Sequence, residues 1–100
     1  MLIRKYRWSK VYESSEEELV ALFQQKSIEA THWFGEDGEV FTDKRYPQDT
    51  RLWCAEGMVS CVVAGKNYSL QPGDVLDIPA QVSCTLRVGF GGCGMYESGA

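Results

Sequence analysis

Four cysteines and one histidine are the side chains of this 100-residue chain best suited to nucleophilic or metal chemistry. The cysteines are Cys54, Cys61, Cys84 and Cys93. No two of them form a C-x-x-C pair, in which one turn presents both sulfurs to a metal or a redox partner, so the spacing predicts neither a zinc knuckle nor a dithiol motif. Because free cysteine is among the most buried residue types, each thiol is expected to be a small core residue unless a neighbour activates it.

The single histidine, His32, lies in a stretch where apolar residues recur at every second position. Ile28, Ala30, His32 and Phe34 would share the apolar face of a strand, which the two glycines of the GEDGE segment then end. An imidazole on such a face is more often a hydrogen-bonded core residue than a base or a ligand. His32 is nevertheless kept as a candidate binding residue.

Length and charge restrict the possible functions further. A chain of 11.3 kDa is expected to form one domain. Its formal net charge of -4 disfavours nucleic acids and anionic membranes as partners. No apolar run approaches the roughly 18 residues needed to span a bilayer, and the basic N-terminus lacks the apolar stretch of a signal peptide. We therefore expect a cytoplasmic protein.

One short helix is predicted near the N-terminus. Ser14 and Ser15, followed by Glu17 and Glu18, form overlapping S-x-x-E capping boxes. An apolar stripe follows at helical spacing, consisting of Leu19, Val20, Leu22 and Phe23. These signals predict a helix over about 15–26, which at three turns is marginal alone and must pack on a sheet.

Most of the remaining chain reads as short strands separated by turn residues. The candidate strands after residue 39 are 40–44, 51–56, 58–64, 67–70, 74–79, 82–89 and 92–97. Gly65 to Asn67 predicts a tight hairpin, since glycine and asparagine tolerate positive φ. Many short strands without a second helix predict an antiparallel sandwich or barrel. The domain is expected to combine an arm and helix over 1–27 with a β-barrel over 28–100.

Two turn motifs carry a family resemblance. Pro72-Gly73-Asp74 makes a sharp corner, because proline fixes φ and glycine avoids a side-chain clash, and Ile78-Pro79-Ala80 ends the next strand. Together with Glu56-Gly57 upstream, they resemble the second motif and preceding hairpin of the cupins. The resemblance implies a small, mainly β domain, an antiparallel double-stranded β-helix or jelly roll, with one short N-terminal helix.

The same resemblance implies that this chain lacks the usual metal centre. Typical cupins hold a divalent metal with two histidines and a glutamate from the first motif and one histidine from the second. In the register set by Gly57, those four positions hold Lys44, Tyr46, Thr50 and Cys84. A slip by one residue in the loop would put Asp43 and Arg45 there instead, which restores at most one carboxylate. Lysine and threonine are poor metal ligands, and a thiolate with a phenol supplies too few donors. A metal-free and cofactor-free protein is expected.

Alternate residues of a barrel strand point inward, so the inward side chains of this chain could form a ligand-binding site inside the barrel. The inward residues of two strands are expected to be Thr50, Leu52 and Cys54, and Val82, Cys84 and Leu86. Lys44 and Tyr46 would lie at the mouth. A binding module would hold a small organic molecule there, anionic if Lys44 pairs with its carboxylate or phosphate. The candidate ligand-binding residues are Lys44, Tyr46, Thr50, Cys54, Cys84 and His32.

Two alternatives stay open. A metal-independent isomerase or thiol-dependent hydrolase would use Cys84 as nucleophile or acid/base, with Lys44 or His32 lowering its pKa. A structural protein would act through a surface or as a homodimer, with the arm over residues 1–10 adding a strand to a neighbour's sheet.

Overall fold

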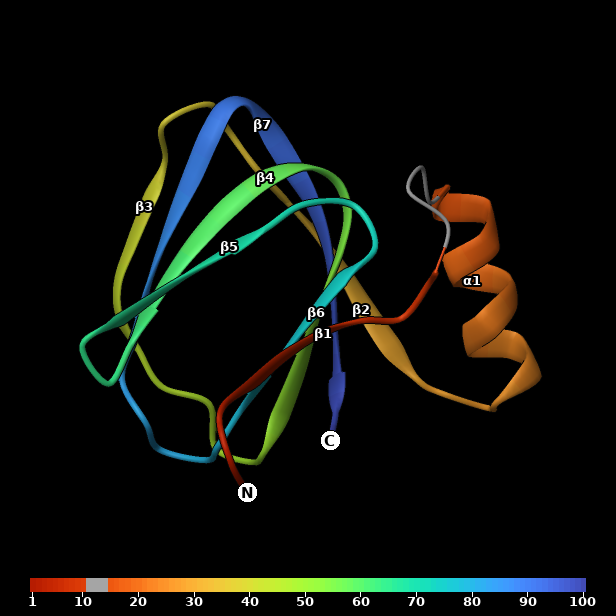
Figure 1. The fold of residues 1–100 in the computed structure, drawn as a ribbon, viewed down its shortest axis with the longest axis horizontal. Coiled ribbons are helices and arrows are strands. Elements are labelled where there is room, and N and C mark those ends of the chain that lie inside the picture. Colours follow the sequence, from red (N-terminus) through yellow and green to blue (C-terminus); the bar gives the residue numbers. More distant parts are fainter. Residues whose placement is uncertain (11–14) are drawn as a thin grey trace.

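The computed structural model describes residues 1–10 and 15–100. Its elements in chain order are β1 (Arg4–Arg7), α1 (Glu16–Gln25), β2 (Ala30–Gly35), β3 (Val40–Lys44), β4 (Thr50–Val63), β5 (Lys66–Leu70), β6 (Asp74–Ile78) and β7 (Cys84–Gly99). The strands pair antiparallel and curl into a barrel, with the helix standing to one side (Figure 1). The expected mainly β jelly roll with one short helix is confirmed.

The barrel is built around β4 and β7, because each is long enough to belong to two sheets. The first half of β4 and the second half of β7 form one sheet, in the order β1-β6-β4-β7-β2. Their other halves pair with each other between β5 and β3. The two sheets face each other and enclose the main core (Figure 1).

The bends in β4 and β7 correct the expectation that Gly57 and the GFGG segment end strands. Gly57 has φ 71°, Gly91 has φ 89° and Gly92 has φ 90°, and hydrogen bonding continues on both sides of them. At this corner the two backbones nearly touch, since a Cβ on Gly57 would lie 2.0 Å from the Gly92 carbonyl oxygen. Glycine therefore lets both strands turn from one sheet into the other without ending.

The N-terminal arm forms an intrachain strand, which the sequence pattern does not predict. β1 pairs with β6, where two buried aspartates face basic residues of the arm and of β4. The Arg7 Nη1 donates to Asp74 Oδ1 at 3.1 Å, and the Arg51 Nε donates to Asp77 Oδ1 at 2.7 Å. The arm thus completes its own sheet, and strand addition to a second subunit stays a prediction.

Helix α1 begins as predicted. Ser15 is the N-cap, and its Oγ accepts a hydrogen bond from the Glu18 amide at 3.2 Å, whereas Ser14 lies outside the described residues. Leu19 and Phe23 are buried, and the Phe23 ring meets Trp53 edge-on with centroids 4.9 Å apart. The helix covers the outer face of the sheet. Among the described residues, no helix is long and apolar enough to cross a membrane.

The predicted hairpin is present one residue earlier than expected. Val63 pairs with Lys66, so the turn consists of Ala64 with φ 51° and Gly65 with φ 77°. Asn67 already belongs to β5. The reason is that a primed turn needs two consecutive positive φ angles, and Ala64 accepts the first of them.

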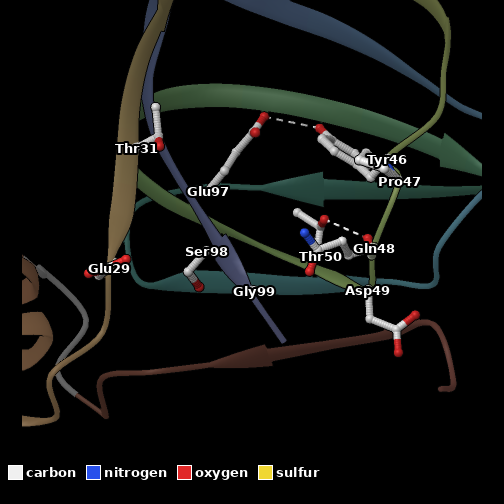
Figure 2. A pocket seen from close by; sticks show the side chains of 10 residues that line it. All are labelled: Glu29, Thr31, Tyr46, Pro47, Gln48, Asp49, Thr50, Glu97, Ser98 and Gly99. Carbon is white, nitrogen blue, oxygen red and sulfur yellow. Dashed lines mark hydrogen bonds between the residues drawn. The ribbon is translucent and has the colours of Figure 1, made fainter.

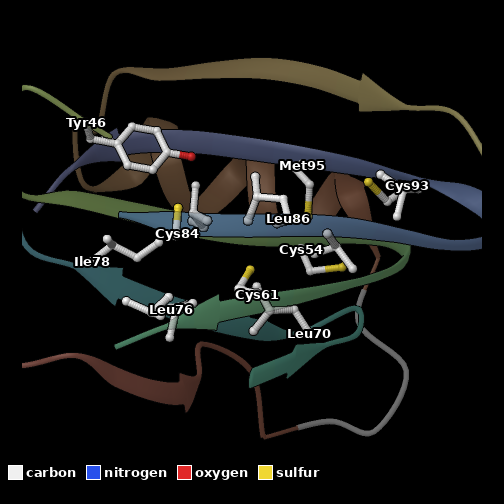
Figure 3. Packing of buried hydrophobic residues seen from close by; sticks show 14 residues of the cluster. Tyr46, Cys54, Cys61, Leu70, Leu76, Ile78, Cys84, Leu86, Cys93 and Met95 are labelled. Atoms are coloured by element: carbon white, nitrogen blue, oxygen red, sulfur yellow. The ribbon is translucent and has the colours of Figure 1, made fainter. Parts of the chain in front are cut away.

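Buried side chains from facing strands fill the barrel interior behind the mouth. Leu52, Cys54 and Leu86 are fully buried and Cys84 is 1% exposed, as their predicted inward positions require. They interlock with Leu76, Ile78, Met95 and other core residues (Figure 3). The side chains predicted to form a binding site inside the barrel are therefore accessible only near its open end, where Tyr46 and Thr50 line a hollow.

Candidate functional site

A hollow of about 290 Å³ lies at the mouth of the barrel (Figure 2). Two predicted site residues, Tyr46 and Thr50, line it together with Thr31, Gln48 and Glu97. Tyr46 follows β3 and Thr50 begins β4, so the connection between these two strands forms one wall of the hollow. β2 and the end of β7 form the opposite wall (Figure 2).

Glu97 is the central residue of this site, and the sequence reasoning missed it. β7 pairs Glu97 with Leu52, whose side chain points into the barrel, and with Thr31 on β2. The signal was present in the alternation of Cys93, Met95 and Glu97, because the first two are buried core residues and alternate strand residues share a face. A carboxylate thus points inward at the open end.

The Glu97 carboxylate joins two predicted residues. Its Oε1 accepts a hydrogen bond from the Tyr46 hydroxyl at 3.2 Å and lies 3.4 Å from the Lys44 Nζ. Lys44 is 36% exposed along its side chain and Glu97 24%, so water still reaches the cluster. The geometry brings a base, a phenol and a cation together at one place.

The Lys44 ammonium also lies over three aromatic rings. Its Nζ is 5.2 Å from the Tyr46 ring centroid, 5.4 Å from that of Trp33 and 5.7 Å from that of Phe41. The negative faces of such rings attract a cation within about 6 Å. The Lys44 Nζ therefore lies among groups that attract a cation from several sides.

Tyr46 acts as a hydrogen-bond donor. Its side chain is 5% exposed, and burial, followed by the charge of Glu97, raises the pKa of the phenol well above its usual value. The hydroxyl keeps its proton and directs it at the carboxylate. Thr50 is 8% exposed and its Oγ1 donates to the Gln48 carbonyl at 2.9 Å, so this hydroxyl orders the wall of the hollow.

Cys84 lies directly behind the mouth but is poorly placed as a nucleophile. Its side chain belongs to the core, and burial raises the pKa of the thiol while the nearby Lys44 charge acts in the opposite direction. Burial likewise raises the pKa of Cys54 to about 12. Neutral, enclosed thiols are unreactive, since the thiolate is the nucleophile.

His32 and Cys54 lie apart from the mouth. The register places Trp33 opposite the buried Met95, so Trp33 points inward and His32 points outward, which corrects the expected facing of this strand. The His32 ring stacks on Tyr96 at 4.3 Å, and its Nε2 lies 3.5 Å from Glu16 Oε1. Phe34 is 67% exposed for the same reason.

Cys54 sits near the strand corner, where its Sγ is 3.8 Å from the carbonyl oxygens of Glu56 and Gly57. Figure 3 shows it on the side of the core away from Tyr46. The structure therefore brings together Lys44, Tyr46, Thr50 and Cys84, and leaves the other two candidates elsewhere.

The residues at the mouth do not fit the divalent metal that typical jelly-roll proteins of this kind hold. Three carboxylates line the hollow, those of Glu29, Asp49 and Glu97, but they project from different walls and do not converge on one point (Figure 2). Within residues 1–10 and 15–100, no three histidine, cysteine, aspartate or glutamate side chains come together in a way that could hold a metal ion.

The fold is shared with several solved structures. A cupin 2 domain-containing protein from Halorhodospira halophila aligns with a TM-score of 0.70 at 14% identity, over 99% of this chain and 76% of that one. A DUF861 family protein from Thermotoga maritima aligns with a TM-score of 0.66 at 20% identity, over 96% and 97% of the two chains. A cupin superfamily protein from Desulfitobacterium hafniense gives a TM-score of 0.64 at 17% identity, over 98% and 76%.

The chain therefore has the cupin fold, and the resemblance seen in its turn motifs is confirmed. It is a small cupin-fold domain with Lys44, Tyr46 and Thr50 at the open end of its barrel and Cys84 in the core behind them. No family model and no curated protein matches its sequence.

Proposed function

We propose that this cupin-fold domain binds a small polar molecule at the mouth of its barrel. The observation that carries the proposal is Glu97, a carboxylate that points inward at the open end of an otherwise apolar barrel. An ion pair that is partly removed from water is seldom more stable than apolar residues of the same size. A paired Lys44 and Glu97 at this position are thus better explained by recognition than by stability.

The size of the hollow limits the ligand. Its volume of about 290 Å³ lies at the lower end of the roughly 300–1,000 Å³ typical of ligand pockets. Behind it lie the buried side chains of the core, Cys84 among them, so the ligand is expected to stay at the open end. A compact molecule that accepts or donates a few hydrogen bonds would fit, with Glu97 and Gln48 within its reach.

A nuclear magnetic resonance screen of small neutral, cationic and anionic compounds against the 15N-labelled chain tests the proposal. Compounds that bind should shift the amide signals of Thr31, Gln48 and Glu97. Thr31→Phe should fill the hollow and abolish these shifts, whereas Thr42→Phe, on an exposed position of β3 outside the hollow, should leave them intact. Shifts confined to other surfaces, or shifts that survive Thr31→Phe, would contradict the proposal.

A thiol-dependent enzyme has less support. Cys84 is 1% exposed, and burial raises its pKa, so the cluster offers no accessible thiolate. The alkylation rate of Cys84 in the native protein distinguishes the two functions.

A further inference from the structure

The mouth of the barrel already holds an ammonium group, that of Lys44. Three aromatic rings, those of Trp33, Phe41 and Tyr46, have their centroids within 5.2 to 5.7 Å of the Nζ. The Glu97 carboxylate adds a counter-charge at 3.4 Å. We call these four residues the aromatic cage. Aromatic rings with a nearby carboxylate form the usual arrangement for recognising organic ammonium ions.

The charge of the adjoining hollow favours the same ligand class. Three carboxylates, those of Glu29, Asp49 and Glu97, line it, and among its described lining residues there is no lysine or arginine. Asp49 uses one oxygen to accept a hydrogen bond from the Ala80 amide at 2.8 Å. An anion would meet repulsion here, and a cation would be attracted.

Lys44 is able to leave the cage without a change in the fold. It ends β3, its side chain is 36% exposed, and in the described part of the chain Glu97 is the one carboxylate paired with it. A lysine ammonium is strongly hydrated and sits on a flexible stem, so it can move into water. A ligand ammonium that takes its place would preserve the charge balance around Glu97.

Resting on the proposed binding function, we infer that the aromatic cage is a site for a small organic ammonium ion and that Lys44 is its intramolecular competitor. The body of the ligand would extend into the hollow, because Tyr46 and Glu97 belong to both. Lys44 then limits the affinity for the ligand, because part of the binding free energy is spent on displacing the Lys44 ammonium from the cage.

Tetramethylammonium chloride is the probe for this site, with binding followed by titration calorimetry and by the Trp33 indole N–H signal. Lys44→Met removes the competitor and should bind the probe about tenfold more tightly than the unaltered chain, because the ring faces and Glu97 are then free of the resident ammonium. Adding Glu97→Gln to this variant should weaken binding again.

Lys66→Met is the matched control. The Lys66 Nζ also lies over a tyrosine ring, 5.3 Å from the Tyr68 centroid, and its removal changes the net charge equally. Its affinity for the probe should equal that of the unaltered chain. The inference is overturned if Lys44→Met binds no more tightly than Lys66→Met.

A measurement on the unaltered chain covers the case in which Lys44→Met does not fold. Ring currents from three aromatic side chains should displace the Lys44 Hε signals from their usual positions. Rising tetramethylammonium concentrations should move these signals toward the values of a free lysine, while sodium chloride at equal ionic strength should not. Unchanged Lys44 signals at saturating probe would overturn the competition.

A neutral probe of the same shape separates this inference from the proposed function. If tert-butanol shifts the Thr31 and Gln48 amides as strongly as tetramethylammonium does, the mouth binds small molecules without selecting a cation. The inference then fails and the proposed function stands. If neither compound nor any other in the screen reaches the mouth, both fail.

Discussion

The hydroxyl of Tyr46 donates a hydrogen bond to Oε1 of Glu97 at 3.2 Å, and the same oxygen lies 3.4 Å from the Lys44 Nζ. Tyr46 and Glu97 are 51 positions apart in the chain, and they meet because β7 passes beside the connection from β3 to β4. This pair links the packed core to the open mouth, since Tyr46 belongs to the core and Glu97 lines the hollow.

The Tyr46–Glu97 pair can be measured by a double-mutant cycle. Tyr46→Phe should lower the free energy of unfolding by about 1 kcal/mol, the usual contribution of one hydrogen bond. Glu97→Gln should cost about 1–2 kcal/mol, because it also removes the partner of Lys44. Urea denaturation of both single variants and the double variant should give a coupling of about 0.5–1 kcal/mol. Strictly additive effects would show that the contact contributes nothing.

Cys84 should react slowly with iodoacetamide in the native protein at pH 7. The thiol is 1% exposed, and its raised pKa keeps it protonated, so alkylation should be slower than that of a free thiol. Mass spectrometry of peptides from the alkylated protein gives the rate at each cysteine, with the urea-unfolded chain as the reference. A native rate at Cys84 above the unfolded rate would restore the thiol-enzyme alternative.

The buried thiols should make the protein less stable at alkaline pH. Burial raises the pKa of Cys54 from 9.0 to about 12, so between these values the unfolded chain loses a proton that the folded chain keeps. The free energy of unfolding should therefore be unaffected by this thiol below pH 9 and fall above it, by about 1.4 kcal/mol per pH unit.

Cys54→Ala provides the control for this pH dependence. The substitution should cost stability at every pH through the cavity it leaves, but its profile above pH 9 should be shallower than that of the unaltered chain. Urea denaturation at pH 8, 9 and 10 measures both. Parallel profiles would show that Cys54 does not titrate as its burial predicts.

Asp77 should be important for attaching the N-terminal arm. It is 4% exposed and contacts Arg51 at 2.7 Å, the Tyr6 hydroxyl at 3.2 Å and Arg4 at 3.7 Å. Asp77→Asn removes the buried negative charge that pairs with Arg51, 28% exposed along its side chain, and should cost about 1.5–3 kcal/mol, the usual contribution of a hydrogen bond to a charged group.

Asp43→Asn is the matched control for Asp77→Asn. Asp43 also pairs with an arginine, Arg45 at 3.2 Å, but its side chain is 62% exposed, and its replacement should leave stability nearly unchanged. Denaturation midpoints give the comparison, and hydrogen exchange of the β1 amides tests whether the arm has loosened. Equal midpoints for the two variants would contradict the assignment.

The corner between the sheets predicts a contrast between two glycines. Gly57→Ala would bring a Cβ within 2.0 Å of the Gly92 carbonyl oxygen at a position with φ 71°, and should cost at least about 3 kcal/mol. Gly65 also has a positive φ, 77°, but a Cβ there would meet open space, so Gly65→Ala should cost only about 1–2 kcal/mol of stability. Thermal denaturation distinguishes the two, and equal losses would mean that the backbone contact at the corner is dispensable.

The local chemistry of the sequence was sufficient for much of the fold. Ser15 and Glu18 mark the start of the helix, and Pro72 and Gly73 mark a corner. Gly65 marks the turn of the hairpin between β4 and β5. These features are predictable because helix capping and positive φ angles depend on neighbouring residues alone. The register of the turn motifs also identified Lys44, Tyr46, Thr50 and Cys84 as neighbours.

Only the tertiary structure decided what these residues do. Alternation divides a strand into two faces, but which face lies inside depends on pairing with distant strands, and so Trp33 and Glu97 point inward while His32 points outward. β1 is a strand because its backbone pairs with β6, where Asp74 and Asp77, about seventy residues away, form ion pairs with its basic side chains. The residues of the aromatic cage come from four separate parts of the chain: Trp33 from β2, Phe41 from β3, Tyr46 from the segment after β3, and Glu97 from β7. No local sequence pattern could therefore have revealed the cage.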